Sequence, residues 1–483
     1  MLFHTWPFVL FFMVVYPTYL LLKGTRFRLA WLLAASYFFY AWLNPLYLIL
    51  ILYSTLVDYT VVTRMAKSPA PIELSETHPR SGKGGTRTLR QLVRGRKMWL
   101  SISIVNNVAL LGFFKYGGFV TDNLNVLLSS LGIPYAIPAP GIILPVGISF
   151  YVFQSMSYTI DYYRGNIERE ESFVRYATFV SFFPRLLAGP IERAKNLLPQ
   201  LHKTPTVSLQ NVTDGLSLFV VGFFKKVALA DYMALYVNKV YAAPEQFQSP
   251  ALILATFLFC WQIYFDFSGY TDMARGVARM MGLRLMLNFN NPYLASSLGD
   301  FWSRWHISLS SWFKDYVYIP LGGNRKGTFN TYKNMFLTMV ISGLWHGAAW
   351  TFVIWGAAHA FGRFLTRELE RTSFYKERVP KLVKQLFVFT FVTFAWIFFR
   401  AESINDAWLI ITRIFTSGFA NPYCPLLTLV LVFAVWFYQF AYESRLKWIL
   451  ALRPVRVGIV VLMVLYLAVF APSSEQGFIY LQF

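Results

Sequence analysis

Charged residues are scarce in this sequence, and their scarcity excludes an ordinary soluble fold. Only 14% of the 483 residues are charged, whereas 56% are hydrophobic and 19% are aromatic. Soluble domains usually contain about a quarter charged residues. Because the apolar residues form long runs with no polar linker between two halves, we predict an all-α polytopic membrane protein with one membrane domain over residues 1–483.

Cysteines and acidic residues are also few. Cys260 and Cys424 are too few for a disulfide framework or a four-ligand zinc site, so neither a metal nor a bound cofactor is expected. The 44 Lys and Arg outnumber the 23 Asp and Glu, which gives a formal charge of +21. This charge is scattered over the segments between apolar runs, which argues against nucleic acid as a partner and favours membrane lipids and topology signals.

Basic residues set the expected orientation of the chain. Three of them follow the first apolar run, which lacks a positive leader region, so we expect a retained span with the N-terminus outside. Residues 64–97 hold nine Lys and Arg against two Glu and are predicted to be a cytoplasmic loop. In all, we predict about ten to twelve transmembrane helices plus re-entrant or interfacial helices. Spans are expected at 29–43, 46–62, 98–120 and 141–158, with three more beyond the basic segment 363–384.

The region 299–359 contains two histidines that each follow a tryptophan, and it is the predicted catalytic core. His346 lies in an apolar run, 335–358, that is long enough to span a bilayer as one helix. An ionisable residue in such a run generally lines a cavity and marks a reaction or transport path. The alternative is a histidine that joins packed helices by a hydrogen bond.

The helical period gives the expected surroundings of each histidine. Small residues flank His346 in a continuous helix, which leaves room for a slim substrate or a close helix. His359 would lie about 220° further around that helix, so a structural role is predicted for it. His306 falls on the apolar side of a more polar segment, so we expect an interfacial or re-entrant helix whose histidine faces protein or lipid. The flanking residues of His346 are Ser342, Gly343, Ala349 and Trp350.

The segments FWSRWHISLSSWFKDYVYIPLGGNRKG and GLWHGAAWTFVIWG resemble the signature of membrane-bound O-acyltransferases, in particular the bacterial branch that O-acetylates exopolysaccharides such as alginate. Supporting matches extend from about Gly141 to Phe399. The resemblance implies that His346 is the catalytic histidine and His306 the second histidine of the pair. It also implies a thinned membrane domain in the bacterial inner membrane, acetyl-CoA as cytoplasmic thioester donor, and a polysaccharide or a periplasmic acetyl-transfer protein as acceptor.

Acyl transfer from a thioester to an alcohol needs a base for the hydroxyl proton. Neutral imidazole, with an ordinary pKa near 6.5, suits this task, and such a base contributes about 10²–10⁴ in rate. We expect His346 to be this base and His306 to orient the donor or stabilise the developing charge. The sequence has no G-x-S-x-G elbow, so covalent serine catalysis is not expected, whereas a double displacement through His346 stays open.

Three further motifs carry weaker predictions. Arg325 and Lys326 lie in a Gly-Gly turn without P-loop spacing; they are candidates for coenzyme phosphates, but a positive-inside anchor explains them more simply. The segment 183–201 is either an amphipathic surface helix or part of the rim of the donor entrance. Charges in the segment 261–276 are predicted to support the site structurally, and a catalytic role is the alternative. They include an i,i+3 pair, Asp272 and Arg275, beside Asp266.

Two other classes of protein explain part of the same pattern. A transporter or channel for an acyl or glycan intermediate would also use intramembrane His, Asp and Arg, although no repeated broken-helix pattern is visible. A structural scaffold would explain the hydropathy but leaves both histidines without a role. The resemblance favours an O-acyltransferase over both.

Overall fold

The computed structural model describes residues 1–67, 83–138, 141, 144–470, 477 and 479. Within these residues the chain is helical and contains no strand, which confirms the predicted all-α class. The chain divides into two compact units. Unit 1 comprises Met1–Val212 and Ala278–Leu285, and unit 2 comprises Thr213–Val277 and Met286–Phe483. The single membrane domain expected over 1–483 stays a prediction.

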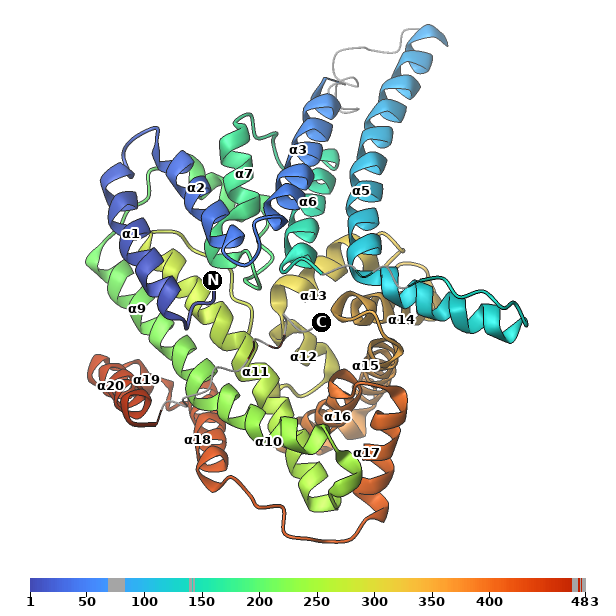
Figure 1. The fold of residues 1–483 in the computed structure, drawn as a ribbon, viewed down its shortest axis with the longest axis vertical. Helices are drawn as coiled ribbons and strands as arrows, with labels where there is room; N and C mark the ends of the chain where they lie inside the picture. Colours follow the sequence, from blue (N-terminus) through green and yellow to red (C-terminus); the bar gives the residue numbers. More distant parts are fainter. Residues whose placement is uncertain (68–82, 139–140, 142–143, 471–476, 478, 480–483) are drawn as a thin grey trace. The chain divides into compact units, whose positions relative to one another are not determined.

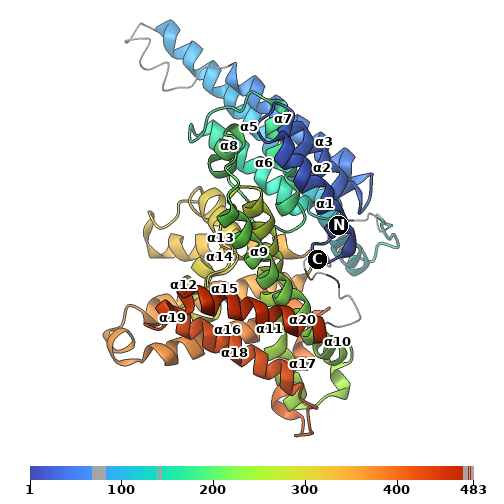
Figure 2. The ribbon, with the colours of Figure 1, turned by 90° about the vertical axis from the view of Figure 1, so that its left-hand side faces the viewer.

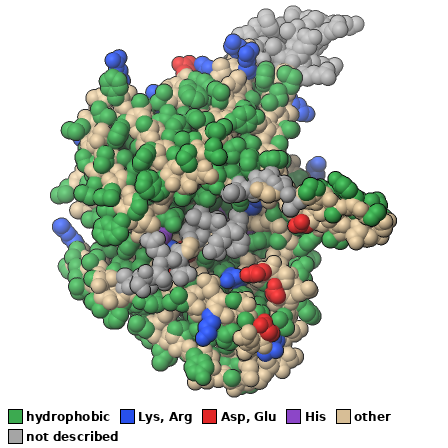
Figure 3. All heavy atoms as spheres, viewed as in Figure 1, with side chains coloured by type: hydrophobic (Ala, Val, Ile, Leu, Met, Phe, Trp, Pro, Cys, Tyr) green, Lys and Arg blue, Asp and Glu red, His purple; other side chains and the backbone are tan. Residues whose placement is uncertain are grey.

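Six helices of the described residues are long and apolar enough to cross a membrane. Figure 3 shows hydrophobic side chains over most of the visible face, as expected of a protein surrounded by lipid. The last three of the six are the three spans expected near the C-terminal end. The six helices are α3 (Tyr47–Ala66), residues 95–130 of α5 (Lys83–Ser130), α11 (Ser249–Met280), α16 (Lys381–Arg400), α18 (Leu426–Glu443) and α20 (Arg453–Phe470).

Unit 1 is built mainly from the N-terminal helices, in which α3 packs against both α5 and α6 (Figure 1). A buried polar cluster joins two of them. Asp58 of α3 accepts hydrogen bonds from Ser103 Oγ at 2.6 Å and from Asn107 Nδ2 at 3.0 Å, both on α5. The other helices of this unit are α1 (Trp6–Leu22), α2 (Arg28–Ala41), α6 (Ile148–Tyr163), α7 (Phe173–Ser181), a 3₁₀ turn (Phe183–Arg185) and α8 (Ala194–His202).

Two expectations for unit 1 differ from the structure. The stretch 64–97 is not simply a loop, because α3 extends to Ala66 and α5 begins at Lys83; residues 68–82 lie outside the described residues. The segment 183–201 is not one surface helix, since its prolines interrupt helical hydrogen bonding before α8 begins. Arg185 is therefore buried, and its guanidinium donates to the carbonyls of Phe179 and Val180.

Unit 2 contains the histidine segments within a bundle of helices. Figure 2 shows α16 and α18 side by side, and Phe389 and Trp436 join them with ring centroids 4.8 Å apart. Glycines let α9 approach α11 closely: a Cβ at Gly222 would lie 2.5 Å from the carbonyl oxygen of Gly269. The remaining elements are α9 (Leu209–Phe224), a π-helix (Lys225–Ala230), α10 (Asp231–Tyr241), α12 (Leu298–Arg304), α13 (Ile307–Phe313), a π-helix (Lys314–Tyr318), α14 (Gly327–His346), α15 (Trp350–Leu369), α17 (Ile404–Thr416) and α19 (Lys447–Ala451); short 3₁₀ and π turns cover Pro244–Gln246, Pro292–Leu294 and Phe374–Arg378.

The apolar run 335–358 is two helices, so the prediction of one continuous helix is wrong. α14 ends at His346, and the backbone is extended at Gly347 (φ −156°) and Ala349 (φ −149°) before α15 begins. The two helices then pack as an antiparallel hairpin, because a Cβ at Gly343 would lie 2.2 Å from the carbonyl oxygen of Phe352. Ala349 and Trp350 are consequently not helical neighbours of His346.

Candidate active site

His306 occupies a break between two short helices of unit 2. α12 ends at Arg304 and α13 begins at Ile307, while His306 itself has a left-handed backbone, with φ of 42°. Asn288 stabilises this break: its carbonyl accepts from Ile307 N at 2.9 Å and its Oδ1 accepts from Ser308 N at 3.2 Å. These bonds satisfy amides at the start of α13. The continuous amphipathic helix expected here is therefore interrupted at the histidine.

The imidazole of His306 is enclosed by protein. Its exposed fraction is 0%, which confirms that it faces away from bulk water. The ring of Phe267 packs edge-on against it, with centroids 4.6 Å apart. His306 lies outside the six candidate spans, and burial lowers its pKa to about 3, because an apolar environment disfavours the charged imidazolium. The ring is therefore neutral at pH 7.

His346 is the last residue of α14, and the structure brings it to His306. The centroids of the two imidazoles lie 6.4 Å apart, at an interplanar angle of 54°. His346 has an exposed fraction of 4% and packs against Trp355 at 5.2 Å and Phe399 at 5.4 Å. Both histidines thus lie at helix ends, where one small reacting group can contact both rings.

His359 is not part of this pair. It lies on a different helix from His346, contrary to the predicted single helix. It belongs to α15 and is fully buried between Trp302, at 5.1 Å, and Trp355, at 4.8 Å. Trp355 also packs on His346, so one indole ring lies between these two histidines. The structural role predicted for His359 stays a prediction, but the helical angle used to separate it from His346 does not apply.

A large groove follows α14 up to the histidine pair. It has a volume of about 910 Å³, and its wall includes Ser342, one turn before His346, and Ile307, directly after His306. Lys314, Arg325, Arg363 and Arg367 line this "basic groove", and none of the described residues that line it is acidic. Lys326, the other phosphate candidate, is exposed beside it. The remaining lining residues are Gly299, Trp302, Ser303, Leu309, Ser310, Ser311, Phe313, Tyr318, Ile319, Gly322, Gly323, Asn324, Met335, Thr338 and Met339.

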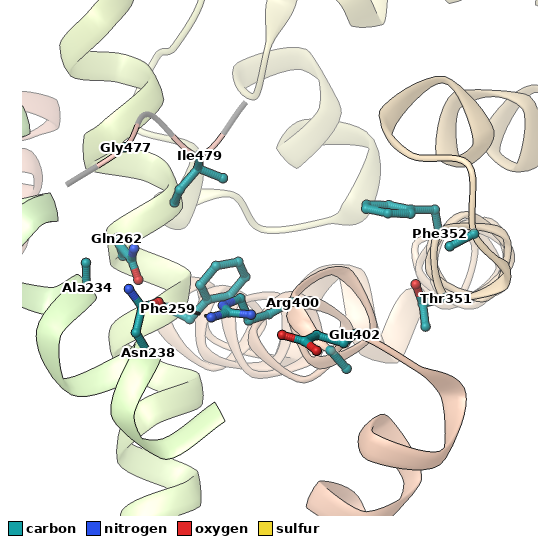
Figure 4. A pocket seen from close by; sticks show the side chains of 12 residues that line it. Ala234, Asn238, Phe259, Gln262, Thr351, Phe352, Arg400, Glu402, Gly477 and Ile479 are labelled. Atoms are coloured by element: carbon teal, nitrogen blue, oxygen red, sulfur yellow. Dashed lines mark hydrogen bonds between the residues drawn. The ribbon is translucent and has the colours of Figure 1, made fainter. Parts of the chain in front are cut away.

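A second cavity begins after the break at Gly347. This "polar cavity" has a volume of about 350 Å³ and is lined by residues that carry both signs of charge and two amides (Figure 4). Phe352 lines it and packs at 4.9 Å against Phe399, which in turn packs against His346. The two cavities share no lining residue. Those of the polar cavity are Ala234, Asn238, Phe259, Gln262, Ala349, Thr351, Phe352, Arg400, Ala401, Glu402, Gly477 and Ile479.

The charges of the segment 261–276 form ion pairs. Asp272 accepts from Arg275 at 3.1 Å, which confirms the predicted i,i+3 pair, and from Lys225 at 2.7 Å. Asp266 pairs at 2.8 Å with Lys226, a buried lysine that the motif analysis missed. The sequence feature that could have indicated Lys226 is the pair of consecutive lysines directly after the apolar residues of α9. These pairs agree with structural support, which is the usual arrangement of charges buried among helices.

Comparisons with known proteins place this site in a family. Residues 167–405 match the model of the membrane-bound O-acyltransferase family, and this range includes both histidines. Among the described residues, no group of three or more His, Cys, Asp or Glu could hold a metal ion. The family match therefore covers the segment from α7 to the start of α17, which contains both histidines.

Relatives of known function match most of the chain. The probable alginate O-acetylase AlgI of Pseudomonas aeruginosa is 40% identical over 420 residues, which are 86% of this chain and 75% of the relative. The AlgI protein of Azotobacter vinelandii is also 40% identical, over 86% of this chain and 79% of its own length. The peptidoglycan O-acetyltransferase of Helicobacter pylori is 35% identical, over 80% and 73% respectively. The chain is thus an integral membrane O-acyltransferase and belongs to the membrane-bound O-acyltransferase family.

Proposed function

We propose that this protein moves an acetyl group from a cytoplasmic thioester to a hydroxyl of an exported polysaccharide or of a periplasmic relay protein. The observation that carries the proposal is the pair of buried imidazoles, 6.4 Å apart, which the basic groove and the polar cavity approach through different residues. Relatives named for O-acetylation of alginate and of peptidoglycan support a polymeric acceptor and give no support to the transporter alternative.

The basic groove fits an anionic thioester donor. Its four cations suit phosphate groups, which arginine binds through charge-assisted hydrogen bonds. Acetyl-CoA is the donor we propose, because it joins phosphates at one end to a slim pantetheine thioester at the other. The phosphates would lie near Arg325, Arg363 and Arg367, and the thioester would reach past Ser342 to the histidines.

The chemistry follows from two buried imidazoles with different tasks. His346 takes the proton of the acceptor hydroxyl as its oxygen attacks the thioester carbon. The new C–O bond forms, the C–S bond breaks, and the thiolate leaves with a proton returned from His346. A neutral imidazole keeps one N–H donor, so His306 would hydrogen-bond the carbonyl oxygen and stabilise the charge that develops on it. His346 and His306 are thus the proposed catalytic residues.

The proposed topology extends the six candidate spans to about ten to twelve crossings of the bacterial inner membrane. Shorter helices that complete this number include α1, which is apolar over 17 residues. The N-terminus lies outside in this arrangement, and the basic residues of 64–97 lie in the cytoplasm. The basic groove would then open toward the cytoplasm, because Arg325 and Lys326 obey the positive-inside rule.

The test is acyl transfer by the purified full-length protein, supplied with radiolabelled acetyl-CoA and polymer, with and without envelope extract. We expect His346→Ala to abolish transfer, whereas His359→Phe, a ring-for-ring change of a buried histidine outside the pair, should retain it. Both variants are checked for folding and membrane insertion. Full transfer by His346→Ala would remove this residue from the mechanism. Movement of label across sealed vesicles, with no transfer by the wild type, would restore the transporter alternative.

A further inference from the structure

The polar cavity differs in chemistry from the basic groove. Arg400 and Glu402 give it one charge of each sign, and Asn238, Gln262 and Thr351 add hydrogen-bonding groups without charge. Such a wall offers both donors and acceptors and, unlike the basic groove, its two charges balance. Its volume of about 350 Å³ lies at the small end of the range of ligand sites, roughly 300–1,000 Å³. A compact ligand with several hydroxyls fits this combination.

Gln262 points independently to a ligand with a hydroxyl donor. It lies on α11 with an exposed fraction of 6%, and its Oε1 is buried without a hydrogen-bond partner among the described residues. An amide oxygen buried without a partner costs free energy unless a ligand or water supplies a donor. Figure 4 shows Gln262 on the cavity wall beside Asn238 and Phe259, with Asn238 hydrogen-bonded to Arg400 at 3.0 Å.

Two stretches of the cavity wall adjoin residues at the histidine pair. Arg400 and Glu402 follow Phe399, whose ring packs against His346 with centroids 5.4 Å apart. On the other wall, Ala349 and Thr351 follow His346 across the helix break. The ring of Phe399 thus connects the wall of the polar cavity to His346, and none of the residues that connect them lines the basic groove.

Residues near the C-terminal end complete the wall. Gly477 and Ile479 both line the cavity. The amide of Ile479 donates to Asp266 Oδ2 at 2.7 Å, and Asp266 is held by the buried Lys226 at 2.8 Å. Lys226 also pairs with Asp231 at 2.8 Å. The ion pairs of α10 and α11 thus hold Ile479, more than 200 residues from Asp266 in sequence, at the cavity wall.

We propose that the polar cavity is the acceptor subsite and takes one sugar ring of the exported polymer. Gln262 accepts a hydrogen bond from a ring hydroxyl, Arg400 and Glu402 bind others, and the reacting hydroxyl faces His346. A serine of a relay protein would bring a single hydroxyl, which leaves most of the five polar side chains unused. This assignment rests on the proposed function and adds the location and class of the acceptor.

The experiment compares acceptor kinetics of the full-length enzyme in nanodiscs, with radiolabelled acetyl-CoA and three probes: tetramannuronate, chitotetraose and a serine-containing peptide. We expect Gln262→Leu to raise the KM for a tetrasaccharide about tenfold, because one hydrogen bond to a buried group is lost, and to leave the KM for acetyl-CoA unchanged. Thr351→Val is the second variant and preserves shape. Gln439→Leu is the control, since Gln439 is buried outside both cavities and bonds to Tyr264.

A direct measurement keeps this proposal separate from the proposed function. Photocrosslinking with a diazirine-labelled tetrasaccharide, followed by peptide mapping, needs no turnover. Crosslinks to the segments around Gln262, Thr351 and Arg400 would support the acceptor subsite even if the wild type transferred nothing. Crosslinks confined to other segments would overturn it, as would active Gln262→Leu and Thr351→Val variants with unchanged tetrasaccharide KM. A KM effect confined to the serine peptide would assign the cavity to a protein acceptor and also overturn it.

Discussion

The basic groove and the polar cavity flank one helix hairpin but differ in charge. Residues of α14 before His346 line the groove together with four cations, whereas residues after Gly347 line the cavity together with a balanced Arg–Glu pair. If both cavities bound the same kind of ligand, their linings would be expected to carry similar charges. We propose that the two cavities serve two partners of unlike chemistry, an anionic donor and a hydroxylated acceptor, and that the transfer between them takes place at His306 and His346.

The largest expected effect belongs to the centre that both cavities share. We expect His306→Asn to lower kcat about 10²-fold with every acceptor, because the shorter amide cannot place its donor where the imidazole N–H would meet the developing oxyanion. Asparagine is the chosen replacement because it tolerates the left-handed backbone of this position, φ 42°. Transfer assays with two donors and two acceptors check this. His202→Asn, outside unit 2, is the control, and a loss that depended on the acceptor would contradict a shared centre.

A smaller effect is expected at the partition between the cavities. A Cβ at Gly347 would lie 1.9 Å from the ring of Phe352, so Gly347→Ala must displace that ring toward the polar cavity. We expect a loss of about 1–3 kcal/mol in unfolding free energy, as in other overpacked sites, together with weaker acceptor binding. Thermal unfolding in detergent measures the first. Gly118→Ala, where a Cβ meets nothing within 4 Å, should change neither quantity.

A substitution in the basic groove should weaken donor binding and leave acceptor binding unchanged. Arg363 lines the basic groove and lies over Gly299, where a Cβ would be 2.7 Å from the guanidinium carbon. We expect Arg363→Ala to raise the KM for acetyl-CoA about tenfold, through loss of a charge-assisted bond to phosphate, and to leave the acceptor KM unchanged. Arg371→Ala is the matched control, because Arg371 pairs with Glu368 away from the groove. An equal rise in the KM for acetyl-CoA in both variants would mean that Arg363 contributes only to the overall positive charge and does not bind phosphate directly.

The smallest expected effect comes from a substitution in the polar cavity, which should weaken acceptor binding and leave donor binding unchanged. Glu402→Gln keeps the shape of the side chain and weakens one hydrogen bond to a hydroxyl, so we expect the acceptor KM to rise about threefold at constant acetyl-CoA KM. Initial rates at varied tetrasaccharide concentration measure this. Glu377→Gln, at an exposed position outside the cavity, provides the comparison. A higher KM for acetyl-CoA in Glu402→Gln would mean that the two cavities do not divide donor from acceptor.

Hydropathy predicted the helical class and the three C-terminal spans, but helical periodicity failed at both histidines. Each failure has a tertiary cause. At His306 the side chain and carbonyl of Asn288 cap a new helix, and at Gly347 the ring of Phe352 occupies the space a Cβ would need. Contacts that do not follow helical spacing are invisible to a pattern read along one segment. The pairing of His306 with His346 came from the family resemblance and not from spacing.

Sequence patterns also failed to predict the interaction partners of some charged residues. A surface helix over 183–201 would leave Arg185 exposed, as arginine usually is, yet its guanidinium is buried inside unit 1 and donates to the backbone carbonyls of Phe179 and Val180. The Asp272–Arg275 pair was predictable because both partners lie on one helix. The partners of Asp266 are Lys226 and the amide of Ile479, which lie far away in sequence, so the segment 261–276 alone does not indicate them.

Aromatic rings enclose both imidazoles: Phe267 packs 4.6 Å from His306, and Trp355 and Phe399 pack within 5.4 Å of His346. Their faces offer water no strong hydrogen bond, so solvent gains little by entering the space around the thioester. We therefore expect hydrolysis, the competing reaction of any activated acyl group, to be suppressed at the proposed site. The packing of these rings would then govern coupling efficiency, which is the number of polymer hydroxyls esterified for each molecule of donor consumed.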